Sequence, residues 1–268
     1  MNSSGRTGEL DNMKFTFGVC STLGNEQRIR DIIYSIEENG IPTSDCEIIV
    51  VGNVTKPCFT KFDVKIFPFD ESVKTGWITR KKNIITENAR FENVVYMHDY
   101  IVLESGWYES MCDHGDDWDL LMTRVVNHDG TRYRDWALCG SWVHNPFIEE
   151  NTMNALLPYD EQRLSKWMYF SGAYWLGKRK FMKKFPLDEL LCWGEGEDVE
   201  WSYRVKESTN FCLNKNAIVK VNKSGKMAAL TESSQDYLDE VHDLITKHGE
   251  VPLPCMKNDL RREDYFND

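Results

Sequence analysis

The sequence predicts an α/β domain built on a central, mostly parallel sheet flanked by helices. Short runs rich in β-branched and aromatic residues predict buried strands, and segments of helical periodicity separate them. Most of these strands end in small or polar residues, as strands do at the ligand-binding edge of a parallel sheet. The strands predicted in the first half span residues 14–20, 46–51, 63–69 and 93–97.

The helices follow from apolar periodicity and from their end signals. After the first strand, Asn25 is a predicted N-cap, Gly40 ends the helix, and isoleucines line one face between them. A basic helix is expected over about 79–90. The second half predicts strands at 119–126 and 167–176, a helix at 197–205, and a C-terminal amphipathic helix at 234–248.

Composition excludes several classes of protein. The formal net charge of −11 argues against a general nucleic-acid binder, which needs many lysines and arginines for phosphate contacts. The eight cysteines include no Cys-x-x-Cys pair, so reduced thiols are expected, not a zinc knuckle. The polar start lacks a signal-peptide core, and no apolar run approaches the ~20 residues of a membrane span. We therefore expect a cytoplasmic protein without a membrane span.

Two segments carry chemistry that suits an anionic ligand. Arg80, Lys81 and Lys82 lie near a predicted helix start, where free N–H groups already favour an anion, so they form a candidate diphosphate clamp. A solvated basic turn is the alternative. At the end of the fourth strand, His98 and Asp99 are candidate ligands for a metal or a phosphate, although such a pair also occurs for structural reasons.

An acidic block suggests general base chemistry. Glu195, Glu197, Asp198 and Glu200 lie close together among glycines that let the backbone bend. Like charges at this spacing repel, so a cation or a substrate hydroxyl is expected beside at least one of them. A carboxylate fixed at a helix start can accept a proton from an alcohol. The alternative is an acidic surface turn.

Taken in order, these segments resemble the inverting glycosyltransferases of the GT-A fold, particularly family 2, over roughly residues 14–225. Five features have a counterpart in that family: the end of the first strand, the turn after the second strand, the Lys-Asn pair of the basic helix, the small-residue turn and the Glu-Asp block. The resemblance implies donor binding by Cys20, Ser21, Thr22, Asn53, Arg80, Lys82, Asn83, His98 and Asp99. It implies acceptor binding by Ser171, Gly172, Trp193 and Gly194.

The resemblance also implies a reaction and a domain layout. Asp198 would be the general base and Glu197 would position the acceptor in an inverting single displacement from a nucleotide-sugar, by default a UDP-sugar, to a hydroxyl of a glycan or glycoconjugate, as in polysaccharide biosynthesis. The implied GT-A domain has a nucleotide-binding half at 14–104 and an acceptor half at 105–225. Residues 1–13 are expected to be a disordered tail, and 226–268 a helical extension.

The sequence departs from the family at its metal motif. Tyr100 stands where the family's last aspartate usually binds the cation, and a protonated phenol is a poor ligand for Mg²⁺ or Mn²⁺. Two interpretations follow: either Asp99 and His98 hold a divalent cation, or Lys82 and Lys223 replace it as counter-charges. The sequence also leaves open a retaining transferase, a nucleotidyltransferase, and a carbohydrate-binding or nucleotide-sugar-binding protein without catalysis.

Overall fold

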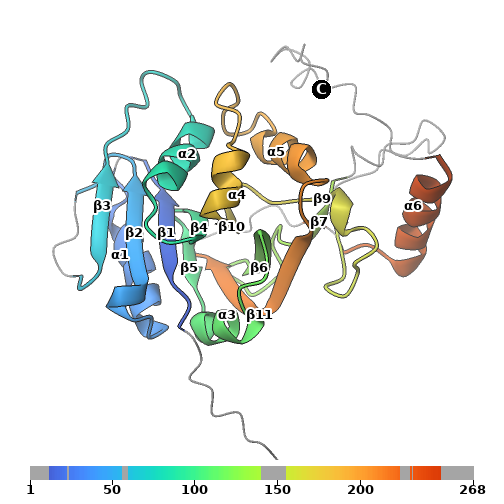
Figure 1. Cartoon of the computed structure of the whole chain (residues 1–268), viewed down its shortest axis with the longest axis horizontal. Coiled ribbons are helices and arrows are strands. Elements are labelled where there is room, and N and C mark those ends of the chain that lie inside the picture. Colours follow the sequence, from blue (N-terminus) through green and yellow to red (C-terminus); the bar gives the residue numbers. More distant parts are fainter. Residues whose placement is uncertain are drawn as a thin grey trace, which may run out of the picture.

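A single curled sheet forms the centre of the protein, with helices packed on its faces (Figure 1). The computed structural model describes residues 12–22, 24–55, 60–139, 155–223, 230 and 232–248. The eight strands follow the order β3-β2-β1-β4-β10-β6-β11-β5. They are β1 (Phe15–Cys20), β2 (Cys46–Val51), β3 (Asp63–Phe67), β4 (Asn93–His98), β5 (Ile101–Leu103), β6 (Leu120–Val126), β10 (Tyr174–Lys178) and β11 (Phe211–Val221).

A small second sheet and six helices complete the described chain. The second sheet has the order β8-β7-β9, formed by β7 (Ala137–Leu138), β8 (Ala155–Leu156) and β9 (Met168–Tyr169). The helices are α1 (Glu26–Glu38), α2 (Ile78–Asn88), α3 (Trp107–His114), α4 (Arg179–Lys184), α5 (Glu197–Val205) and α6 (Gln235–His248). Short 3-10 turns occupy Thr43–Asp45 and Ser165–Trp167.

The predicted parallel sheet is confirmed for its first half. Strand β1 pairs in parallel with β2 on one side and with β4 on the other, and β2 pairs in parallel with β3. In this register Cys20 lies between Val51 and His98, so three carboxyl ends meet at one edge. In the second half β10 and β5 run antiparallel to their neighbours, which makes the sheet mixed.

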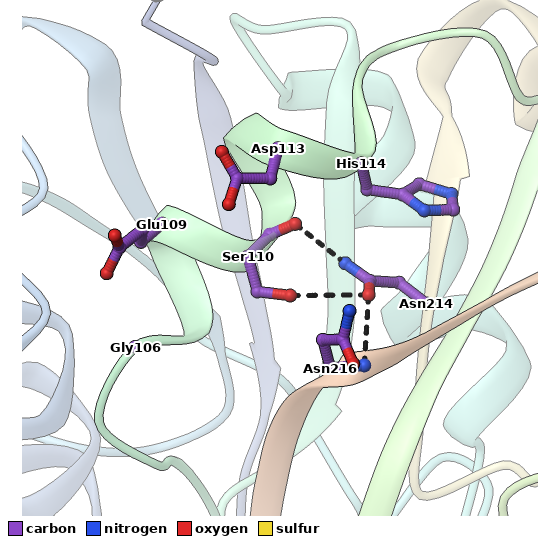
Figure 2. Close-up of a pocket in the computed structure, with 7 residues that line it drawn as sticks. All are labelled: Gly106, Glu109, Ser110, Asp113, His114, Asn214 and Asn216. Atoms are coloured by element: carbon purple, nitrogen blue, oxygen red, sulfur yellow. Dashed lines mark hydrogen bonds between the residues drawn. The ribbon is translucent and has the colours of Figure 1, made fainter.

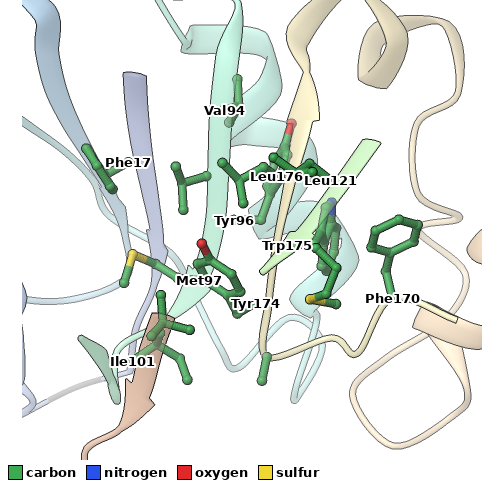
Figure 3. Close-up of a cluster of buried hydrophobic side chains, with 14 of the residues drawn as sticks. Phe17, Val94, Tyr96, Met97, Ile101, Leu121, Phe170, Tyr174, Trp175 and Leu176 are labelled. Atoms are coloured by element: carbon green, nitrogen blue, oxygen red, sulfur yellow. The ribbon is translucent and has the colours of Figure 1, made fainter. Parts of the chain in front are cut away.

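Aromatic stacking joins the two halves of the sheet (Figure 3). Trp175 on β10 stacks on Tyr96 of β4, with ring centroids 5.2 Å apart, and on Trp201 of α5 at 5.6 Å. All three side chains are fully buried. Aromatic pairs of this kind contribute energy beyond their buried area. The stack therefore fixes α5 against the centre of the sheet.

The close packing of α2 on β1 depends on Gly18. A Cβ at this position would lie 2.2 Å from Cγ2 of Ile85, far inside contact distance. We expect Gly18→Ala to lower the free energy of unfolding by about 2 to 3 kcal/mol, because the helix must move away from the sheet. Urea unfolding measures this loss. In an Ile85→Ala background the clashing methyl is gone, and the same substitution should be nearly neutral; an equal loss in both backgrounds would contradict this packing.

Several local predictions from the sequence are wrong. The single strand expected at 167–176 is divided into β9 and β10, because Ser171 and Gly172 form a turn closed by a hydrogen bond from Tyr174 N–H to the Ser171 carbonyl. Asn25 makes no side-chain cap of α1. Met13, expected in the tail, is buried. The helices α3 and α4 and the strand β11 were not predicted.

The C-terminal helix α6 packs on the rest of the domain. Leu238 and Val241 are buried, as the amphipathic pattern predicts for Val241, and Asp239 pairs with Arg163 at 2.8 Å. Residues 1–11 and 249–268 of the expected tail and extension lie outside the described residues. Across the described part of the chain, no helix has the length and apolar character needed to cross a membrane.

Candidate active site

Asp99 anchors the edge where β1 and β4 end. Its Oδ2 accepts hydrogen bonds from the Ser21 hydroxyl at 2.8 Å and from the Asn25 amide at 2.7 Å. Its Oδ1 lies 3.3 Å from Nη1 of Arg28, which forms an ion pair with it. Asn25, expected to cap α1, thus uses its side chain on Asp99 instead. The buried carboxylate joins the first turns of α1 to the end of β4.

His98 is buried beside this carboxylate and retains an unpaired ring nitrogen. Its Nδ1 lies 2.9 Å from the hydroxyl of Tyr100, while Nε2 has no hydrogen-bond partner among the described residues. Burial, followed by the nearby ammonium groups of Lys82 and Lys223, lowers the pKa of His98 well below its usual range. The imidazole is therefore neutral at physiological pH.

The lysines of α2 reach the strand ends from the helix. Lys81 donates to the Ser21 carbonyl at 2.7 Å and forms an ion pair with Glu71. Lys82 is fully buried, donates to the Gly172 carbonyl at 2.8 Å, and lies 4.1 Å above the Trp175 ring. The Lys82 ammonium thus connects the basic helix to the turn that precedes β10.

The acidic block lies against the same turn. Gly196, with φ of 72°, precedes α5 and places Glu197 and Asp198 in its first turn. The Gly172 N–H donates to Oδ2 of Asp198 at 2.7 Å, and the Val199 N–H donates to Oδ1 at 2.9 Å. A helix N-terminus favours the carboxylate further. The Asp198 side chain is therefore held as an acceptor of hydrogen bonds in a fixed position.

Gly172 allows this close approach. A Cβ there would lie 3.2 Å from Oδ2 of Asp198 and 3.2 Å from Oε1 of Glu197. Burial and the neighbouring Asp198 raise the pKa of Glu197 to about 7, while Lys82 opposes the rise. Two adjacent carboxyl groups with one ammonium nearby form an arrangement in which one can stay protonated while the other accepts a proton.

The raised pKa of Glu197 makes stability depend on pH. Between its ordinary value of 4.5 and about 7, the folded protein holds a proton that the unfolded chain has released, so stability falls as pH rises through this window. We expect Glu197→Gln to remove this fall. The free energy of unfolding of the variant, relative to that of the wild type, should therefore rise by about 2 to 3 kcal/mol between pH 4.5 and pH 8. Urea unfolding at both pH values tests this. Glu200→Gln is the control on the same helix turn, and an equal stability difference at both pH values for Glu197→Gln would contradict the buried-carboxyl account.

The structure brings together most residues of the three predicted motifs. Cys20, Ser21, His98 and Asp99 meet at the strand ends, and Lys82 connects them to Gly172. Burial raises the pKa of the Cys20 thiol to about 11, so it is neutral. Ser171 is buried in the turn beside Gly172, and Thr22 is exposed just after β1.

Three predicted donor residues have other contacts. Arg80 pairs with Glu87 at 2.9 Å and with Glu189 at 3.0 Å, on the part of α2 that faces the 187–191 segment. Asn83 donates to the Leu187 carbonyl and to Glu189. Both side chains therefore hold that segment to α2.

Asn53 also has an internal role. Its side chain exchanges two hydrogen bonds with the backbone of Phe69 and so fixes the chain that follows β3. Donor binding by Arg80, Asn53 and Asn83 stays a prediction.

The predicted acceptor residue Trp193 lies on the surface near the acidic block. Its side chain is 69% exposed, and its backbone N–H donates to the Gly76 carbonyl at 2.8 Å. Gly194 follows with φ of 83°, a conformation that favours glycine. Leu190 is also exposed. An exposed tryptophan beside a carboxylate pair suits stacking on a sugar ring.

Sequence reasoning missed one of the two cations at the strand ends, Arg28. Arg28 lies in the first turn of α1, and Lys223 follows β11 with its Nζ 3.7 Å from the Tyr100 ring centre. The sequence named Lys223, with Lys82, as a counter-charge in place of a metal, but it did not select Arg28. Nothing in the pattern of α1 distinguishes Arg28 from the exposed Arg30, because only the fold places Asp99 opposite one of them.

The described residues do not fit the expected metal site. Asp99 is the single carboxylate of the His98–Tyr100 turn, and Ser21, Asn25 and Arg28 already donate to it. Burial raises the pKa of Tyr100, which keeps its phenol protonated. No group of three His, Cys, Asp or Glu side chains in the described ranges could hold a metal ion. A cation at Asp99 would have to displace Arg28.

A separate cavity lies on the other side of the domain, between α3 and β11 (Figure 2). Glu109 and Asp113 project at its rim. The Asn214 amide group donates to the Ser110 backbone carbonyl and accepts from the Ser110 hydroxyl. Figure 1 places α3 at the end of the molecule opposite α2 and α5. Two carboxylates at the rim oppose the entry of a diphosphate.

The chain has a GT-A-like fold, with a mostly parallel central sheet, flanking helices and one domain. It is similar in structure to GalNAc-T7 with UDP, GalNAc and Mn²⁺, at a TM-score of 0.56 and 16% identity, over 88% of this chain and 48% of that one. The chain thus spans about half the length of that protein. It is also similar to residues 1–349 of S. aureus TarS in complex with UDP-GlcNAc, at a TM-score of 0.53 and 14% identity, over 94% of this chain and 69% of that one. No family model and no curated protein matches the sequence.

Proposed function

We propose that this protein is a glycosyltransferase that moves a sugar from a nucleotide-sugar to a hydroxyl group of a glycan or glycoconjugate. The observation that carries the proposal is the fixed position of the Asp198 carboxylate. The Gly172 N–H donates a hydrogen bond to this carboxylate, and Lys82 connects the Gly172 turn to the strand ends. The GT-A-like fold supports it, because both neighbouring structures are glycosyltransferases bound to UDP or a UDP-sugar. UDP is accordingly the expected nucleotide.

The proposed reaction is a single displacement with inversion. The nucleotide lies across the ends of β1, β2 and β4, in the half formed by residues 14–104. The acceptor lies in the half formed by 105–225, against Trp193 and Gly194. The acceptor oxygen attacks the anomeric carbon, the bond from that carbon to the diphosphate oxygen breaks, and Asp198 takes the hydroxyl proton.

Glu197 and the fixed cations complete the proposed mechanism. Glu197 is protonated over part of the neutral range, because its pKa is about 7, and can donate a hydrogen bond to the acceptor. The leaving nucleoside diphosphate carries away the electron pair, and positive side chains at the strand ends stabilise its charge. Assembly of a polysaccharide in the cytoplasm is the setting that we propose.

A binding protein without catalysis is the second candidate. The observation that favours it is the departure of the His98–Tyr100 turn from the metal motif of the family, since Asp99 already binds three protein donors. A retaining transferase would share the donor site but would not need Asp198 as base.

Thermal unfolding in the presence of nucleotide-sugars tests the proposal. We expect one of UDP-, GDP-, CMP- or dTDP-sugars to raise the melting temperature selectively. Free nucleotide should be released slowly when water accepts the sugar, and faster when an acceptor glycan accepts it. Binding without any release of nucleotide would support the binding protein. No shift with any of the four, in folded protein, would contradict both candidates.

A further inference from the structure

We propose that Arg28 and Lys223 bind the diphosphate of the donor directly and so replace a divalent cation. The inference rests on the proposed function, because it assigns the diphosphate of that donor. Arg28 and Lys223 are called the cation pair below. Neither belongs to the basic helix that the sequence selected for this role.

The cation pair flanks the end of β4 from two sides. Arg28 extends from α1 to Oδ1 of Asp99 at 3.3 Å, and Lys223 extends from the end of β11 over the ring of Tyr100 at 3.7 Å. The backbone holds this arrangement, because the Asn222 N–H donates to the Tyr100 carbonyl at 2.7 Å. Two separate elements thus bring positive charge to the position where the family holds its metal.

The charge at this position is not balanced within the described residues. Asp99 is the one carboxylate that pairs with Arg28, and no carboxylate in the described ranges pairs with Lys223. Burial and the nearby Arg28 lower the pKa of Lys223, while Asp99 opposes the fall, so a single carboxylate lies near both cations. Placing like charges together is unfavourable unless an anion completes the site. A diphosphate supplies that anion.

The unpaired ring nitrogen of His98 is an independent observation that points to a ligand at this edge. The contact between Nδ1 and the Tyr100 hydroxyl can run in either direction, and when the hydroxyl donates to Nδ1 the ring proton lies on Nε2. In either tautomer, the buried Nε2 has no hydrogen-bond partner in the described chain. A buried donor without a partner is costly, and a phosphate or ribose oxygen would satisfy it.

Lys81 and Lys82, on the opposite side of the site, are less suited to bind the diphosphate because both already have partners in the protein. Lys81 already pairs with Glu71 and donates to the Ser21 carbonyl, and the buried Lys82 donates to Gly172. The cation pair is more exposed than either lysine and is thus accessible to a ligand from solvent.

Calorimetric titration of UDP into the full chain tests the inference. In EDTA we expect UDP to bind, and saturating Mn²⁺ to change the dissociation constant by less than about threefold, while Arg28→Gln and Lys223→Gln each weaken binding about 10- to 100-fold. Uridine, which has no phosphate, should bind equally weakly to all variants. Arg30→Gln on the exposed side of α1 and Lys215→Gln on β11 are the matched controls and should bind UDP as the wild type does.

The outcomes separate the inference from the function on which it rests. UDP binding that requires Mn²⁺, or binding that both glutamine variants retain, would overturn the cation pair and leave the transferase intact. Failure of UDP, GDP, CDP and dTDP to bind at all, with or without Mn²⁺, would overturn both. Far-ultraviolet circular dichroism and thermal unfolding of each variant show that lost binding is not lost folding.

Discussion

Asp198→Asn is expected to reduce sugar transfer about 1,000-fold while UDP binding stays within about twofold of the wild type. The amide keeps the shape of the side chain, and its oxygen can still accept from the Gly172 N–H at the 2.7 Å position. It cannot take a proton from the acceptor hydroxyl. Transfer is measured as acceptor-dependent release of nucleotide, and binding by calorimetry.

The control for this substitution lies on the same helix. Glu200 is also in the first turn of α5, but its carboxylate pairs with Arg204 at 2.7 Å. Glu200→Gln should therefore leave transfer unchanged. If Asp198→Asn transfers sugar at the wild-type rate, Asp198 is not the base, and a retaining mechanism becomes the better account of the site.

Lys82→Met is expected to lower the free energy of unfolding by about 3 kcal/mol at pH 8. The substitution leaves the Gly172 carbonyl without its donor and removes the ammonium that opposes the rise in the pKa of Glu197. The carboxyl pair then titrates at higher pH. We therefore expect the loss of stability to be smaller at pH 5, where Glu197 is protonated in either protein. Urea unfolding at the two pH values measures both effects.

Two comparisons make this prediction specific. Lys180→Met, at an exposed position of α4, should change stability by less than about 0.5 kcal/mol at either pH. A Lys82→Met protein as stable as the wild type at pH 8 would contradict the buried contact with Gly172. A loss that is equal at pH 5 and pH 8 would show that Lys82 acts on packing alone, without the carboxyl pair.

The parallel half of the sheet was predictable because each signal there is local. The strands β1, β2 and β4 are buried along their whole length and are mostly apolar, and the face of α1 repeats isoleucine at helical spacing. The second half was harder, because its elements depend on distant contacts. Strand β11 carries an irregularity between Asn214 and Ile218 that breaks its alternation.

The candidate site was predictable where one segment carries the chemistry. The acidic block and the turn at Gly172 were both selected from the sequence, and the structure joins them by the hydrogen bond to Asp198. The role of Arg28 could not be predicted, since it depends on Asp99, which lies 71 residues away in the sequence. Arg80 shows the converse, because a cluster of like charges on a helix does not say which of its members pairs with carboxylates of the protein.

The most direct test of the account is a structure of the protein with a UDP-sugar in EDTA. The account predicts the nucleotide across the ends of β1, β2 and β4, the diphosphate within hydrogen-bond distance of Arg28 and Lys223, and the anomeric carbon facing Asp198. A nucleotide bound elsewhere, such as the cavity between α3 and β11, or a sugar directed away from Asp198, would contradict it.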